Sequence, residues 1–167
     1  YSERSKLLSI VLTDKTAVDQ ITVREIVSLG RYTQTNWLGS LKKFDLALIS
    51  SSLQMVGLNN FEDRSYGTLS DGEKQRTFIA KALASNAPVM ILDEPTAHLD
   101  IPNRVEIMTL LKKLTREKNQ SVLVSTHDLD LAIQLADEIW LLRNDDDVIC
   151  TTPEEAIASG MLNNYFG

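Results

Sequence analysis

The chain has 167 residues, of which 43% are hydrophobic and 24% are charged. This is enough for one domain, or part of one, with a buried core, and it excludes a disordered tail. The formal net charge of −6 argues against a nucleic-acid partner, because general nucleic-acid binding depends on many Lys and Arg contacts to phosphates. The single cysteine, Cys150, excludes an internal disulfide and a thiolate metal cluster.

The apolar runs of the sequence are far shorter than the roughly 20 residues of a membrane-spanning helix, and no signal peptide is visible. We therefore expect a cytoplasmic location. The sequence opens with Tyr1 rather than Met, so we expect the numbering to start inside a longer gene product.

The first part of the chain predicts one strand followed by helices. Residues 6–13 form a short apolar run with β-branched members, typical of a buried strand. Thr22 and Glu25 have the spacing of a capping box, so a helix is expected to begin there and to end near Gly30. Residues 42–56 predict a second helix with apolar residues at helical spacing, namely Phe44, Leu46, Leu48, Ile49, Leu53 and Val56.

From residue 70 onward, predicted helices and strands alternate. A second capping box begins at Ser70 and starts a helix that runs to Ser85. The elements expected after it are a strand over 88–92, a helix over 102–118, a strand over 121–125, a helix over 129–137, strands over 138–142 and 148–151, and a short helix from Pro153. This alternation is typical of an α/β fold with a parallel sheet.

Two adjacent carboxylates, Asp93 and Glu94, follow the predicted strand 88–92. In an open parallel sheet, ligands bind outside the carboxyl ends of the strands. A carboxylate there can hold Mg²⁺ directly or through water, and its neighbour can orient or deprotonate an attacking water. The alternative is a strand followed by an ordinary polar loop.

The two histidines differ in their predicted positions. His127 follows the strand 121–125, where an imidazole can hydrogen-bond a transferring phosphoryl group or a water. The alternative for His127 is a structural residue or a helix cap. His98 is expected in a loop.

Ser70, Asp71, Gly72 and Glu73 form the predicted first turn of the 70–85 helix. Gly72 permits close backbone approach, and the free amides of a helix N-terminus favour phosphate. Because Asp71 and Glu73 repel an anion, the amides and the Ser70 hydroxyl must attract it. The alternative is a well-capped helix without a ligand.

Together these segments resemble the ATP-binding subunit of ABC transporters. Residues 69–76 are similar to the signature motif, residues 90–96 to Walker B with its adjacent glutamate, residues 99–100 to the D-loop, and His127 to the switch histidine. The four motifs follow the family's order over about 60 residues. The resemblance implies a partial P-loop NTPase (RecA-like) fold, with a parallel sheet flanked by helices and an ABC-type helical subdomain.

The resemblance divides the chain, as a truncated nucleotide-binding domain, into three parts. Residues 1–21 correspond to the end of the Q-loop strand and its loop, residues 22–85 to the helical subdomain, and residues 86–167 to the RecA-like core. The helical subdomain would reach toward a membrane partner. Its Tyr32 and Trp37 are candidate contacts with that partner, and the alternative is that they are core anchors.

The resemblance implies ATP and Mg²⁺ as cofactors. Asp93 would bind Mg²⁺ through its water shell, and Glu94 would be the general base or would orient the attacking water. His127 would contact the γ-phosphate.

A head-to-tail dimer of nucleotide-binding subunits is also implied. Ser70, Gly72 and the first amides of their helix would bind the γ-phosphate of a nucleotide held mainly by the other subunit. Asp71 and Glu73 belong to the same motif, and Asp100 would lie at the dimer interface.

Two departures from the family pattern change these expectations. The Walker A sequence Gly-x-x-x-x-Gly-Lys-Ser/Thr is absent from the 167 residues, and we expect it upstream of Tyr1. The chain alone is therefore expected to bind ATP weakly or not at all and to lack ATPase activity. Thr13 stands where the family usually has the Q-loop glutamine, and its hydroxyl is a candidate ligand for Mg²⁺ or water.

Residues 30–32, 99–101 and 126–129 look most like importers of iron-siderophore, haem and cobalamin complexes. The resemblance implies an ATP-hydrolysing subunit on the cytoplasmic face of the cell membrane. Its partners would be permease subunits and, indirectly, a periplasmic or lipoprotein substrate-binding protein. The alternatives are a soluble ABC-type ATPase of DNA repair, chromosome structure or translation, and a non-catalytic regulatory fragment.

Overall fold

The structure is a computed structural model that describes residues 3–12, 20–35, 40–118, 120–142 and 148–162. The chain divides into two compact units, Tyr1–Ser125 and Thr126–Gly167, and each is described by itself. Thr13 and Trp37 lie outside the described residues, so their predicted roles remain predictions.

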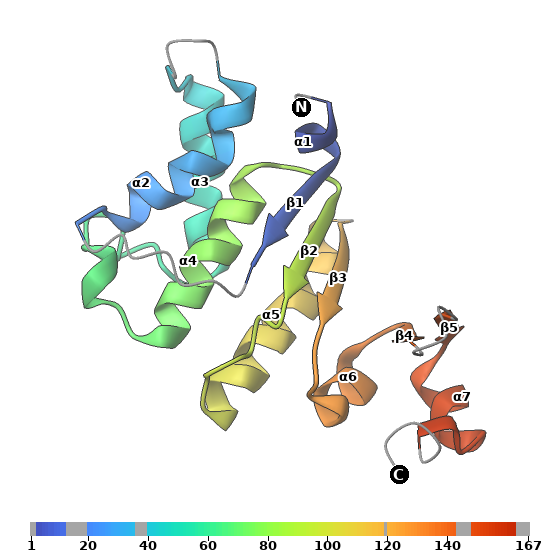
Figure 1. Cartoon of the computed structure of the whole chain (residues 1–167). Helices are drawn as coiled ribbons and strands as arrows, with labels where there is room; N and C mark the ends of the chain where they lie inside the picture. The colour runs from blue at the N-terminus through green and yellow to red at the C-terminus, as the bar shows by residue number, and fades with distance from the viewer. Residues whose placement is uncertain (1–2, 13–19, 36–39, 119, 143–147, 163–167) are drawn as a thin grey trace. The chain divides into compact units, whose positions relative to one another are not determined.

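Three parallel strands form the sheet of the first unit (Figure 1). They are β1 (Leu8–Val11), β2 (Val89–Asp93) and β3 (Ser121–Ser125), in the order β1-β2-β3. The register pairs Ile10 with Ile91, and Ile91 with Leu123. The predicted parallel α/β sheet is confirmed, although β1 begins later than expected because the short helix α1 (Arg4–Leu7) precedes it.

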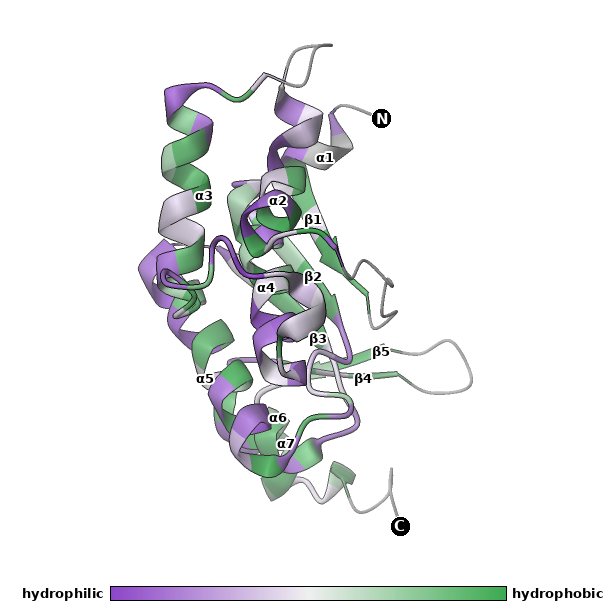
Figure 2. Cartoon of the chain, turned by 90° about the vertical axis from the view of Figure 1, so that its left-hand side faces the viewer, coloured by the Kyte–Doolittle hydropathy of each residue, from purple (hydrophilic) through white to green (hydrophobic). Residues whose placement is uncertain are grey.

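Both crossover helices lie on the same face of this sheet. The chain crosses the sheet in one direction, so right-handed crossovers place α4 (Asp71–Ala84) and α5 (Ile101–Lys118) on one side. Met90 and Leu92 on the covered face are fully buried. On the other face, Ile10 and Leu123 are 54% and 41% exposed. Figure 2 shows hydrophobic residues along all three strands, so the described part of the chain leaves one apolar face uncovered.

The helices from α2 (Val23–Ser28) to α4 form the helical part of the first unit. It begins with α2 and the 3-10 helix η1 (Leu29–Gln34). The capping box predicted at Thr22 is present, because its Oγ1 accepts from the amide of Glu25 over 3.2 Å and the Glu25 carboxylate accepts from the amide of Thr22 over 2.8 Å. The helix α2 ends at Ser28, close to the predicted end near Gly30, and the chain continues as η1. Gly30 packs directly on α4, where an added Cβ would lie 2.1 Å from the carbonyl oxygen of Lys81.

The second predicted helix is α3 (Lys43–Met55), but its apolar face is narrower than the sequence predicts. Ile49 and Leu53 are fully buried, whereas Phe44 and Leu46 are 63% and 45% exposed. The Phe44 ring packs at the surface, 5.8 Å from the guanidinium carbon of Arg31. The apolar stripe is thus wider than the contact that α3 makes with its neighbours.

The helix α4 buries one apolar face. Ile79, Ala82 and Leu83 are buried. Phe78 is half-buried and meets the ring of Tyr66 edge-to-face, with 5.7 Å between ring centroids. Tyr66 belongs to the short 3-10 helix η2 (Tyr66–Thr68), which therefore packs against α4.

The second unit contains a hairpin and two helices. Its elements are α6 (Leu129–Leu135), β4 (Ile139–Leu142), β5 (Val148–Thr151) and α7 (Pro153–Ala158). The strands β4 and β5 are antiparallel and pair Trp140 with Cys150, which confirms the predicted hairpin. Among the residues that the structure describes, no helix combines the length and apolarity needed to cross a membrane.

Candidate functional site

The carboxyl end of β2 holds Asp93 and Glu94 through one hydroxyl of β3. The amide of Glu94 donates to the carbonyl oxygen of Ser125 over 3.1 Å and to its Oγ over 3.0 Å. The same Oγ donates to Oδ1 of Asp93 over 2.6 Å. Ser125 therefore fixes the Asp93 carboxylate and the Glu94 backbone at the end of the central strand.

The loop after β2 contains two residues in a backbone conformation that side chains rarely adopt. Glu94 has a φ of 46° and His98 a φ of 64°. Each such residue costs about 1–3 kcal/mol, and such strain is concentrated at functional sites. Two turn bonds hold the loop, from the amide of Ala97 to the oxygen of Glu94 over 3.0 Å and from the amide of Leu99 to the oxygen of Thr96 over 3.2 Å. The loop thus turns Glu94 away from the direction of the strand.

The first turn of α4 is closed by a reciprocal pair, Ser70 and Glu73. Ser70 Oγ accepts from the amide of Glu73 over 3.3 Å, and Glu73 Oε2 accepts from the amide of Ser70 over 2.7 Å. The bond from the Ser70 amide is the main cause that lowers the pKa of Glu73, ahead of the opposing effect of burial. The predicted capping box is confirmed. Because Glu73 is charged and already accepts from the Ser70 amide, the attraction of phosphate depends on the other amides of this turn and on the Ser70 hydroxyl.

A small pocket of about 40 Å³ brings the first turns of α4 against the loop after β2. Asp71 and Lys74 line it from α4, and Glu94 and His98 line it from the loop. Lys74 brings a positive charge to the lining of this pocket, and its Nζ lies 5.7 Å from the centroid of the Tyr66 ring. The structure therefore brings the predicted signature segment and the predicted general base to the same surface.

Asp100 lies at the start of α5 and is connected to α4 through Asn103. Asp100 Oδ1 accepts from the backbone amide of Asn103 over 3.1 Å and from its Nδ2 over 2.7 Å, which is the geometry of a helix N-cap. An added Cβ at Gly72 would lie 2.6 Å from Asn103 Oδ1. The close approach that Gly72 permits is therefore occupied in this structure by the side chain that also holds Asp100.

Replacing Gly72 by Ala is expected to destabilise the full-length protein by about 1 kcal/mol, because the new methyl group displaces the Asn103 amide from Asp100. In an Asn103→Ala background the same change is expected to stabilise by about 0.5–1 kcal/mol, because alanine is the better helix former. Denaturant unfolding of the four proteins of this double-mutant cycle measures both values. Equal effects of Gly72→Ala in the two backgrounds would contradict the assigned contact.

His127 lies in the second unit, immediately before the cap of α6. Asp128 Oδ1 accepts from the amide of Leu131 over 3.2 Å, and the amide of Asp128 donates to Thr126 Oγ1 over 3.0 Å. These bonds place His127 in a turn with its side chain exposed. Its contact with a γ-phosphate stays a prediction.

The described residues contain no group of three or more His, Cys, Asp and Glu side chains that could hold a metal ion. Asp93 alone, with one oxygen bonded to the Ser125 hydroxyl, fits a Mg²⁺ ion that keeps most of its water ligands. Thr13, the second predicted magnesium ligand, lies outside the described residues. Sequence reasoning missed Ser125, Asn103 and Lys74, of which only Lys74 lies inside a recognised motif.

Comparison with known proteins gives consistent matches. The family model described as ABC transporter matches residues 1–97. The chain is 33% identical over 162 residues to an uncharacterised ABC transporter ATP-binding protein of Methanocaldococcus jannaschii, covering 97% of this chain and 56% of that protein. It is 32% identical over 165 residues to the ferric enterobactin transport ATP-binding protein of Escherichia coli, covering 99% of this chain and 61% of that protein.

A solved structure described as an inward-facing conformation of a putative metal-chelate type ABC transporter is also similar. It superposes with a TM-score of 0.87 at 28% identity, over 96% of this chain and 63% of the other. The chain thus spans 56–61% of the length of the two relatives.

Proposed function

Because this chain belongs to the ABC transporter family, we propose that it is part of an ATP-binding and ATP-hydrolysing subunit that powers a membrane importer. The observation that carries this proposal is the strained loop at the end of β2, which places Glu94 in one pocket with the first turns of α4. The names of a ferric enterobactin relative and a metal-chelate transporter support a chelated metal as the transported substrate, of the iron-siderophore, haem or cobalamin kind.

In this proposal, residues at the ends of β2 and β3 act on ATP and its Mg²⁺ ion. When bound, Mg²⁺ neutralises charge on the phosphate oxygens. Asp93 holds the ion through water, and Glu94 orients the attacking water and accepts its proton. His127 donates a hydrogen bond to the γ-phosphate, and Thr13 is a further ligand for the ion or its water.

The first turn of α4 acts across a head-to-tail dimer. Ser70 and Asp71 are exposed, so a second subunit can approach them. Ser70, Gly72 and the neighbouring amides bind the γ-phosphate of the nucleotide held by that second subunit. Asp71 and Glu73 complete the motif, and Asp100 lies at the interface.

The partner surface of the helical part is formed by Leu29, Tyr32 and Phe44. These are exposed large apolar side chains on η1 and α3, and Tyr32 is 71% exposed, so it is not a core anchor. Leu29 and Tyr32 are three residues apart on a 3-10 helix, where such side chains share a face. The Phe44 ring lies 5.8 Å from the guanidinium carbon of Arg31, the neighbour of Tyr32. Exposed apolar side chains that are grouped mark interaction sites. We assign this surface to the permease, which places the subunit on the cytoplasmic face of the membrane and connects it indirectly to a substrate-binding protein.

The 167 residues alone are expected to bind ATP weakly or not at all and to lack ATPase activity, because they contain no Walker A sequence. The uncovered sheet face with Ile10 and Leu123 supports the view that further structure completes the subunit. Calorimetric titration of the chain with ATP and Mg²⁺ tests this. Saturable binding at micromolar concentrations would contradict it.

Affinity purification of the tagged full-length protein from solubilised membranes tests the proposed function. We expect an integral membrane permease to co-purify, and the complex to hydrolyse ATP faster when the transported substrate is supplied with its binding protein. Recovery of ribosomes or DNA instead would favour a soluble ATPase. Recovery of the permease without any hydrolysis would favour a regulatory role.

A further inference from the structure

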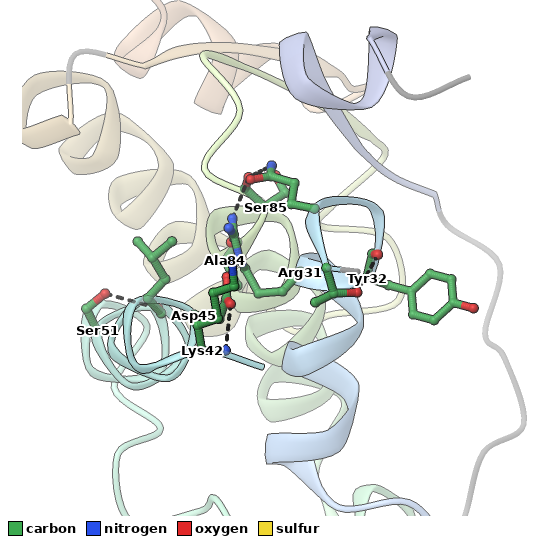
Figure 3. Close-up of polar contacts among 10 residues, drawn as sticks. Arg31, Tyr32, Lys42, Asp45, Ser51, Ala84 and Ser85 are labelled. Carbon is green, nitrogen blue, oxygen red and sulfur yellow. Dashed lines mark hydrogen bonds and ion pairs between the residues drawn. The ribbon is translucent and has the colours of Figure 1, made fainter. Parts of the chain in front are cut away.

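One buried guanidinium, that of Arg31, joins three segments of the helical part (Figure 3). Its Nε donates to Oδ1 of Asp45, in the first turn of α3, over 2.9 Å. Its Nη1 donates to the carbonyl oxygens of Ala84 and Ser85, at the end of α4, over 3.0 and 3.1 Å. Arg31 lies in η1 and is 3% exposed, and Asp45 is 5% exposed. A single side chain therefore connects η1, α3 and the C-terminal end of α4.

The groups around Arg31 hold its guanidinium in one orientation. Asp45 Oδ2 accepts from the amide of Lys42 over 2.8 Å, and this bond is the main cause that lowers the pKa of Asp45, while Arg31 lowers it further. The carbonyls at a helix C-terminus have no partner within the helix and favour a cation. Gln34 adds a second donor from η1, because its Nε2 donates to the oxygen of Ser85 over 2.6 Å.

Arg31 adjoins an exposed residue, Tyr32, along the chain, and its guanidinium bonds the segment that leads into the sheet. Tyr32, next to Arg31 in the chain, points away from the buried pair and belongs to the partner surface (Figure 3). Ser85 begins the short segment that leads from α4 into β2, the strand that ends at Asp93. Gln120, just before β3, holds this segment by donating from Nε2 to the oxygen of Ala87 over 2.6 Å. Arg31 therefore lies between the partner surface and the elements that carry the candidate site.

We propose that Arg31 is a positioning residue that makes η1, α3 and α4 move as one body, so that binding at the partner surface displaces the first turn of α4 relative to Glu94. This inference rests on the proposed function, in which a permease binds the partner surface and that first turn binds nucleotide. A helix of 14 residues such as α4 is a rigid element that carries a displacement from one end to the other. Lysine can replace Arg31 only in part, because an ammonium lacks the planar set of donors that reaches Asp45 and two carbonyls together.

The test compares the full-length subunit, in complex with its permease, with the double variant Arg31→Met/Asp45→Leu. Apolar residues of similar size often replace a buried ion pair without loss of stability. We expect basal ATP hydrolysis to remain within about twofold of the wild type, whereas stimulation by the transported substrate falls about tenfold or more. Arg31→Lys is expected to give a smaller loss, because it keeps the charge but not the full set of hydrogen bonds.

Arg24→Met is the matched control. Arg24 pairs with Glu62 at the surface of the same helical part. Arg24→Met is expected to keep the full stimulation of ATP hydrolysis by the transported substrate.

The proposal is overturned if stimulation of the double variant stays within about twofold of the wild type. It is also overturned if Arg24→Met loses as much stimulation as the double variant. If circular dichroism shows that the double variant does not fold, Asp45→Asn takes its place, since it keeps an acceptor for the Lys42 amide, and unchanged stimulation in Asp45→Asn then overturns the proposal.

Hydrogen exchange separates this inference from the proposed function. If the wild-type complex contains no permease or shows no stimulation, the proposed function fails, and exchange in the full-length protein still tests the connection itself. In the double variant, amides of residues 29–34 are expected to exchange about tenfold faster than in the wild type, with those of residues 71–84 unchanged. Equal acceleration of both segments, or of neither, shows that Arg31 does not join them.

Discussion

Replacing Glu94 by Gln in the full-length protein is expected to lower ATP hydrolysis about 10²–10⁴-fold, because an amide cannot accept the proton of the attacking water. Binding of ATP is expected to persist. The backbone bonds from Glu94 to Ser125 do not involve the side chain, so the strained loop remains as it is. Phosphate release measures the loss of hydrolysis, and gel filtration with ATP is expected to show a trapped ATP-bound dimer.

The matched control for this prediction is Glu117→Gln. Glu117 lies on α5, where Oε1 is 3.7 Å from the Nζ of Lys113, and both side chains are exposed. Because an exposed pair of this kind contributes little, about 0–1 kcal/mol, hydrolysis is expected to be unchanged. Turnover of Glu94→Gln within twofold of the control would remove Glu94 from the role of general base.

Signals that are local in the sequence were sufficient for most of the fold. The capping boxes that begin at Thr22 and Ser70 are present as predicted, because each needs only two residues at a fixed spacing. The strand that precedes Asp93 was recognisable as a short apolar run, and its place beside two parallel neighbours followed from alternation with helices. Asp93 and Glu94 could therefore be assigned to the carboxyl end of a strand in the sheet before the fold was known.

The residues that sequence reasoning missed act through neighbours far along the chain. Ser125 meets Asp93 only because the register of β2 and β3 makes them partners. Asn103 on α5 packs against Gly72 on α4, and no local pattern in the sequence indicates that contact. The left-handed conformation of Glu94 likewise accompanies the bonds that its amide donates to Ser125, and residue type does not predict it.

In the helical part, too, sequence reasoning missed what depends on contacts between distant residues. Periodicity placed Phe44 and Leu46 on an apolar face, but the contact area of α3 is set by its neighbours and leaves them exposed. The pattern after Thr22 predicted a helix end near Gly30, since glycine is common at that position, and α2 does end close by, at Ser28. The structure shows that Gly30 has another role, as the point of contact between two helices.

Replacing Gly30 by Ala is therefore expected to cost about 3 kcal/mol of unfolding free energy, at the upper end for added atoms in a packed interior. The new methyl group would lie 2.1 Å from the backbone oxygen of Lys81, and a backbone oxygen cannot rotate away as a side chain does. Separation of η1 from α4 would also lengthen the bonds of Arg31 to Ala84 and Ser85. Denaturant unfolding of the full-length protein measures the cost.

Gly57→Ala is the control for the same chemical change. Gly57 has a φ of 75°, and an added Cβ there would meet only the Arg76 guanidinium at 3.8 Å. The expected cost is that of the left-handed backbone alone, about 1 kcal/mol. A Gly30→Ala cost equal to or below that of Gly57→Ala would mean that η1 moves away from α4 freely. The two elements would then not be held as closely as Arg31 requires, so this comparison bears directly on whether α4 and the partner surface are one rigid unit.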